Sequence, residues 1–127
     1  MTPEVTDAIQ EIQGAFPGCR VDVADDGAGG AFVTVHEIPL DEGPFAQAGI
    51  WVGFQITHTY PYCDVYPHFV CADLSRRNGA ALGEGMSVGT FRGQPAIQIS
   101  RRSGRHNPAT DTAALKLLKV LRWLKSR

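Results

Sequence analysis

The chain of 127 residues is poor in cysteine, with only Cys19, Cys63 and Cys71 at irregular spacing. An odd, uneven set does not suit the paired disulfide framework of small secreted proteins. No apolar run approaches the roughly 20 residues that are needed to cross a bilayer. The start of the chain, residues 1–4, also lacks the basic residues and apolar stretch of a signal peptide. These absences favour a cytoplasmic protein with no membrane partner.

Basic residues are almost missing from the first part of the chain. Residues 1–73 carry 11 acidic side chains and one basic side chain, Arg20, whereas residues 74–127 carry 11 basic and two acidic side chains. Such a division either marks interaction surfaces or lets the two parts neutralise each other in the fold. Nucleic acid is a disfavoured partner, because aromatic residues are not interleaved with the arginines.

Apolar periodicity predicts one helix at each end of the chain. The first helix begins at Pro3, with Thr2 as its cap, and the last runs from Pro108 to Leu124, with Asn107 as its cap. The last helix is expected to turn its apolar stripe toward the core and its basic residues toward solvent. The stripe comprises Ala114, Leu117, Leu118, Leu121 and Leu124, and the basic face comprises Lys116, Lys119 and Arg122.

Four segments between these helices have the composition of β-strands. They cover residues 20–23, 31–38, 50–56 and 68–74, and turn-forming residues or a loop over 39–49 separate them. Glycine-rich residues 75–95 then predict a long irregular loop, followed by a short apolar run over 96–99. The order predicts a single α+β domain over residues 1–127: a two-layer fold with an N-terminal helix, a four-strand antiparallel meander, a long loop and a C-terminal helix.

Two landmarks carry a resemblance to a known family. The first is the hinge Tyr60-Pro61 through Pro67 between the third and fourth strand segments, and the second is the helix start at Asn107-Pro108. Together they resemble the ubiquitin-conjugating fold, whose members have a Tyr-Pro-rich turn after the third strand, and its non-catalytic relatives, the RWD domains.

Shorter motifs resemble the divergent bacterial conjugating-enzyme-like proteins that are encoded beside ubiquitin-like proteins and activating enzymes. These motifs are Phe91-Arg92-Gly93, Ser100-Arg101-Arg102, Pro108, Asp111 and Trp123-Leu124. The resemblance implies a component of a bacterial ubiquitin-like modification pathway, in antiviral defence, whose partners are the ubiquitin-like protein and its activating enzyme. It implies no cofactor. The alternative is a non-catalytic RWD-like interaction module that is unrelated to ubiquitin chemistry.

The catalytic cysteine of the conjugating family would fall near Gln98, which cannot form a thioester. The His-Pro-Asn triplet of the family is also absent. Three other nucleophiles remain, namely Cys71, Cys63 and Ser100, and His106 is the nearest base for a serine. The chain is therefore either a transferase of the conjugating type with an atypical nucleophile or a pseudoenzyme.

Each candidate thiol has an unreactive interpretation. Cys71 lies in a strand segment, where buried and inert cysteines are common. Asp64 would raise the pKa of the neighbouring thiol of Cys63, because a negative charge disfavours the thiolate. His58, Cys63, His68 and Cys71 lack the tight pairs of a zinc site, so no metal is expected.

A partner-binding surface is expected from the basic segment before the last helix and from the hinge. Its residues are Arg101, Arg102, Arg105, Tyr60 and Tyr62. The planar fork of arginine suits carboxylate or phosphate groups, and a solvated basic loop is the alternative. An acidic surface of an activating enzyme is the expected partner.

Overall fold

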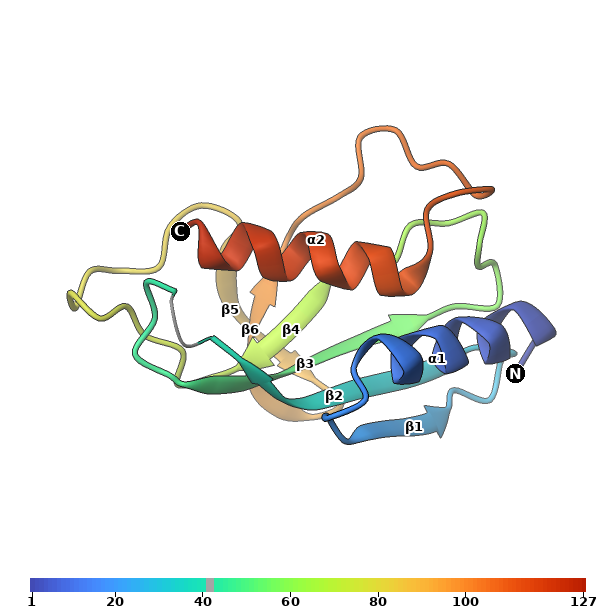
Figure 1. The fold of residues 1–127 in the computed structure, drawn as a ribbon, viewed down its shortest axis with the longest axis horizontal. Coiled ribbons are helices and arrows are strands. Elements are labelled where there is room, and N and C mark those ends of the chain that lie inside the picture. Colours follow the sequence, from blue (N-terminus) through green and yellow to red (C-terminus); the bar gives the residue numbers. More distant parts are fainter. Residues whose placement is uncertain (41–42) are drawn as a thin grey trace.

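The computed structural model describes residues 1–40 and 43–127 and shows an α+β fold (Figure 1). Two helices, α1 (Pro3–Ala15) and α2 (Ala113–Lys125), flank six strands in the sequence. The strands are β1 (Val21–Asp25), β2 (Ala31–Pro39), β3 (Gly49–Ile56), β4 (His68–Cys71), β5 (Met86–Phe91) and β6 (Gln94–Ile99). No helix in the described parts of the chain is long and apolar enough to cross a membrane.

All six strands form one antiparallel sheet with the order β1-β2-β3-β4-β6-β5. Both helices pack on one face of this sheet and contact each other (Figure 1). Alternate strand residues face the helices, and with the apolar sides of both helices they form one buried core. Among its largest members are Phe54, Ile56, Ile99, Leu117 and Leu124.

The first helix agrees with its prediction. The hydroxyl of Thr2 accepts a hydrogen bond from the amide of Val5 at 3.2 Å, and Pro3 occupies the first turn. The four predicted strands are also present as β1 to β4.

The expectation of a four-strand meander followed by a long loop is wrong, because β5 and β6 extend the sheet to six strands. Residues 72–85 connect β4 to β5, so of the loop predicted over 75–95 only the part 75–85 precedes the added hairpin. Phe91 and Gln94 face each other across a two-residue turn, in which Arg92 has φ 52 and Gly93 has φ 80. Two successive positive φ angles are the geometry that joins hairpin strands tightly. Arg-Gly is a weaker signal for this turn than Asn-Gly, so the hairpin was not expected.

The predicted start of the last helix is also wrong, by about one turn. Asn107 closes a separate turn, in which its backbone carbonyl accepts a hydrogen bond from the amide of Asp111 at 2.8 Å. The true cap is Thr112, whose hydroxyl accepts from the amide of Leu115 at 3.2 Å. The segment 107–111 therefore belongs to the loop that leads into α2.

Two residues of α2 lie on the side opposite to the expected one. Leu118, expected in the core, is 43% exposed, whereas Lys116, expected in solvent, is only 7% exposed. The buried face of α2 is centred on Ala113, Leu117, Val120 and Leu124, so it is rotated away from Leu118 and toward Lys116. Lys116 can be buried because it finds polar partners, which are described below.

The face of the sheet that the helices leave open carries a second cluster of aromatic side chains. The ring of Phe91 lies among those of Phe69, Trp51 and Phe32, with centroid distances of 5.3, 6.1 and 6.3 Å. Gly53 lies beneath Phe91, and a Cβ atom at Gly53 would come within 2.4 Å of that ring. A glycine is therefore needed for Phe91 to lie flat on the sheet.

Candidate functional site

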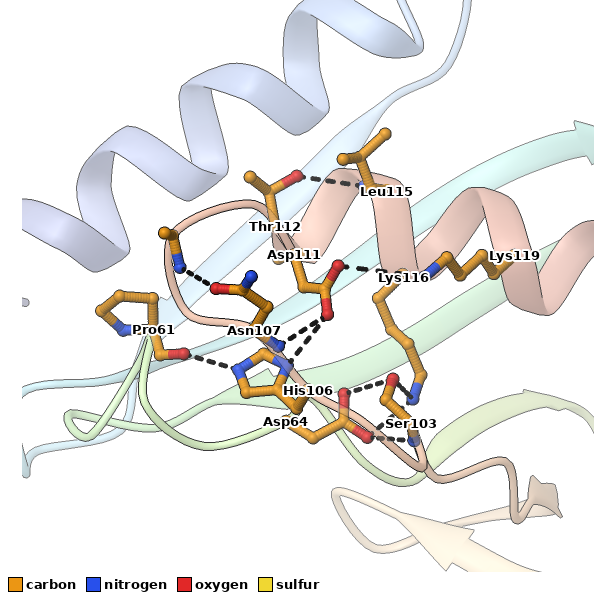
Figure 2. A network of polar contacts seen from close by, with 12 residues as sticks. Pro61, Asp64, Ser103, His106, Asn107, Asp111, Thr112, Leu115, Lys116 and Lys119 are labelled. Atoms are coloured by element: carbon orange, nitrogen blue, oxygen red, sulfur yellow. Dashed lines mark hydrogen bonds and ion pairs between the residues drawn. The ribbon is translucent and has the colours of Figure 1, made fainter.

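Three segments that are distant in the sequence meet beside α2: the hinge after β3, the loop before α2, and α2 itself (Figure 2). Asp64 of the hinge is the centre of this meeting. Its carboxylate accepts hydrogen bonds from the amide of Ser103 at 2.7 Å, the hydroxyl of Ser103 at 3.2 Å and Nζ of Lys116 at 2.7 Å. The Lys116 ammonium also donates to Oγ of Ser103 at 2.9 Å. We call these three residues the hinge triad.

The electrostatics of the hinge triad favour an ionised carboxylate. Burial alone would raise the pKa of Asp64, but the hydrogen bonds from Lys116 and Ser103 outweigh burial and hold the pKa below its ordinary value. The side chains of Asp64 and Lys116 are 15% and 7% exposed, so this ion pair is largely withdrawn from water. Such a pair stabilises the fold only while both partners are present.

The triad does not activate Ser103 as a nucleophile. The hydroxyl of Ser103 donates to Asp64 and accepts from Lys116. Asp64 and Lys116 also form an ion pair with each other. The carboxylate of Asp64 is a weak base because its pKa is lowered, and the amine of Lys116 is held as the partner of that carboxylate. The triad therefore fixes the hinge and the loop to α2.

His106 is directed toward the hinge and not toward Ser100. Its Nε2 lies 2.6 Å from the carbonyl oxygen of Pro61, which only accepts, so Nε2 carries the proton. Its Nδ1 lies 3.9 Å from the carboxylate of Asp111. Ser100 instead accepts from the side chain of Gln98 at 3.3 Å. The expected pairing of Ser100 with His106 as its base is therefore not formed among the described residues.

The hinge also holds the start of α2. The hydroxyl of Tyr60 accepts a hydrogen bond from the amide of Ala113 at 3.1 Å, and its side chain is 9% exposed. Tyr62 lies on the outside of the hinge and is 77% exposed. Of the two tyrosines that were expected to bind a partner, Tyr62 is thus accessible, whereas Tyr60 has a role inside the fold.

The position that was expected to hold a cysteine lies inside a strand. Gln98 belongs to β6 and is paired with Phe69 of β4 on one side and Ser87 of β5 on the other. In this register Gln98 shares the open face of the sheet with Phe69, whereas the flanking Ile97 and Ile99 are buried in the core.

The two candidate cysteines differ in accessibility. Cys71 is half-buried on β4, and burial together with the neighbouring Asp73 raises its pKa to about 12. Cys63 is exposed in the hinge. Among the residues that the structure describes, no three or more histidine, cysteine or acidic side chains gather as a metal site would need, so His58, Cys63, His68 and Cys71 do not form one.

Alkylation with iodoacetamide at about pH 8 is expected to label Cys63 on the order of 100-fold faster than Cys71, because only the thiolate reacts. Peptide mass spectrometry over a time course measures both rates in the same sample. The fast phase should vanish in Cys63→Ser and persist in Cys71→Ser. Equal rates at the two cysteines in the native protein would contradict the assigned environment of Cys71.

The basic segment expected to bind a partner lines a cleft against α2. The cleft has a volume of about 300 Å³ and its lining includes Arg101, Arg102, Arg105, Asp111, Lys116, Lys119 and Trp123. The guanidinium group of Arg101 lies 5.1 Å from the ring centroid of Trp123, and that of Arg102 lies 4.2 Å from the ring centroid of Tyr66. We call this the basic cleft.

Comparison of the chain with protein-family models, curated proteins and solved structures finds no match. The site is therefore assigned from its own geometry. Sequence reasoning included the three arginines and both tyrosines but missed Lys116, Lys119 and Thr112 as members of the site. The sequence did contain a signal for Lys116, because it lies one helical turn from the core residues Ala113 and Val120. At such a position the aliphatic part of a lysine side chain can be buried while its ammonium group reaches a polar partner.

Proposed function

We propose that the protein is a non-catalytic, conjugating-enzyme-like component of a bacterial ubiquitin-like modification pathway, in antiviral defence. In this proposal it binds the ubiquitin-like protein, its activating enzyme or both. The observation that carries it is the hinge triad, which joins the Tyr-Pro hinge to α2. The hinge is the first landmark of the resemblance, and the segment of the second landmark, Asn107-Pro108, lies in the loop that leads into α2.

The absence of catalysis in the proposal is supported by the surroundings of each candidate nucleophile. Gln98 takes the place of the cysteine and lies within a strand. The thiol of Cys71 has a pKa of about 12, and Ser100 has no contact with His106. Cys63 is exposed in the hinge.

The binding surface in the proposal combines Tyr62 with the arginines of the basic cleft. Tyr62 offers an exposed aromatic ring, and aromatic and arginine side chains are the residues most often enriched at protein interfaces. The arginines suit acidic groups on a partner.

A co-elution experiment tests the proposal with any ubiquitin-like protein and activating enzyme that the genes beside this chain encode. The native protein should co-elute with at least one of them. Tyr62→Ala and Arg102→Glu should weaken the complex by about tenfold or more, as the loss of interface anchors commonly does. Arg122→Glu reverses the same charge on the exposed side of α2 and should leave binding unchanged. If neither partner co-elutes at any concentration, the RWD-like interaction module becomes the better interpretation.

A further inference from the structure

The basic cleft contains more positive charge than its own carboxylates neutralise. Five of its lining residues are cationic: Arg101, Arg102, Arg105, Lys116 and Lys119. Lys116 is paired with Asp64 at 2.7 Å, and Lys119 lies 4.0 Å from Asp111. Within residues 1–40 and 43–127, no carboxylate lies within salt-bridge distance of the three arginines. Three arginine charges therefore remain uncompensated in one cleft.

Two of these arginines are already positioned by aromatic rings. The guanidinium carbon of Arg101 lies over the ring of Trp123, and that of Arg102 lies over the ring of Tyr66. Attraction between the cation and the face of the ring restrains each side chain. A ligand that binds these guanidinium groups therefore immobilises side chains that are already partly held in place, which lowers the entropy cost of binding.

The size and charge of the cleft define the ligand. A volume of about 300 Å³ is at the lower end of small-molecule sites and fits a compact group. Two guanidinium groups, from Arg101 and Arg127, already lie over the indole of Trp123, at 5.1 and 4.8 Å, which disfavours stacking of a nucleobase there. Arginine forks match the oxygens of phosphoryl groups in pairs.

We propose that the basic cleft binds a small phosphoanion with two phosphoryl groups, of the diphosphate type. Arg101, Arg102 and Arg105 donate the charge-assisted hydrogen bonds. Asp111 also lines the cleft, where its carboxylate accepts a hydrogen bond from the amide of Asn107 at 2.8 Å and lies 4.0 Å from Nζ of Lys119. This binding needs only the present chain and is independent of the proposed ubiquitin-like partners.

Isothermal titration of the native protein with sodium diphosphate tests the proposal at about 150 mM salt, where weak surface attraction is screened. One site with a sub-millimolar Kd is expected. Orthophosphate, which offers only one phosphoryl group, should bind at least about tenfold more weakly, because fewer paired hydrogen bonds are formed. A diphosphate-bearing nucleotide should bind about as well as diphosphate itself, and a phosphoserine peptide should bind more weakly than both.

Arg101→Gln and Arg105→Gln should each weaken diphosphate binding by about tenfold or more, since a hydrogen bond to a charged group is lost. Arg122→Gln removes the same charge from an exposed position on α2 that does not line the cleft, and its Kd should equal that of the native protein. Thermal unfolding of each variant without ligand confirms that it is folded. Absence of diphosphate binding, equal affinity for orthophosphate, preference for the phosphopeptide, or equal weakening by Arg122→Gln would each overturn the proposal.

Discussion

Acidification from about pH 7 to about pH 4 is expected to lower the free energy of unfolding by roughly 3 kcal/mol through His68 alone. His68 lies on β4, faces the core and is 0% exposed. Burial, and next the nearby Lys116, lower its pKa from 6.5 to about 3, while Asp64 acts in the opposite direction. The folded protein therefore keeps this imidazole neutral over a pH range in which the unfolded chain protonates it.

The sign of this effect follows from proton binding. Between about pH 6.5 and about pH 3 the unfolded state binds a proton that the folded state does not, so stability rises with pH across that window. Above about pH 6.5 neither state is protonated at His68, and its contribution no longer changes. Asp64 adds to the acid loss only at lower pH, because its stabilisation is lost as the pH falls below the ordinary carboxylate pKa toward its lowered value.

His68→Leu is expected to remove most of this acid sensitivity. Neither ring nitrogen of His68 has a hydrogen-bond partner among the residues that the structure describes, so an apolar side chain of similar size should match or exceed the native stability near neutral pH. Urea unfolding at several pH values measures the change. His58→Leu, at an exposed position, is the matched control and should retain the native pH dependence. An unchanged slope in His68→Leu would contradict the assignment.

Loss of the carboxylate of Asp64 should destabilise the protein by about 3 kcal/mol, because it leaves the buried ammonium of Lys116 without a counter-charge. Asp64→Asn keeps the size of the side chain and removes its charge. Without that charge both hydrogen bonds from Ser103 become weaker, and so does the attachment of the loop to the hinge. Denaturant unfolding at about pH 7 measures the loss.

The double variant Asp64→Asn/Lys116→Met separates the charge effect from the packing effect. Once the ammonium is absent, Asp64→Asn should cost at least about 1 kcal/mol less than it does alone, because contacting residues are not additive. Lys119→Met is the matched control for the lysine, since Lys119 is 63% exposed and its pair with Asp111 at 4.0 Å contributes little. Full additivity of the two triad substitutions would show that the ion pair does not couple the hinge to α2.

The elements with strong local signals were predictable from the sequence. The cap at Thr2 and the apolar periods of α1 and of β2 to β4 specify both the type of element and the buried face. The hairpin of β5 and β6 was missed because its strands carry glycine and proline and its turn is Arg92-Gly93. Pairing with β4 supplies the stabilisation that local propensity does not provide.

The candidate site was predictable only in its exposed part. Arginine-rich residues 101–105 are visible as a sequence motif, and they do line the basic cleft. The hinge triad joins residues that are 39 and 52 positions apart, and no local pattern links them. A lysine in an amphipathic helix is normally assigned to solvent, so Lys116 was predicted on the wrong side. Its burial depends on a carboxylate that only the folded hinge brings to it.

The central proposal is that this chain is a conjugating-enzyme-like protein without a working nucleophile. An intact-mass spectrum tests it directly, after incubation with the cognate activating enzyme, the ubiquitin-like protein and ATP. The thioester that the activating enzyme itself forms in the same reaction confirms that the reagents are active. The account predicts that the present chain keeps its unmodified mass. An adduct one ubiquitin-like protein heavier would contradict it: release by thiol would identify a cysteine, and release only by hydroxylamine would identify a serine.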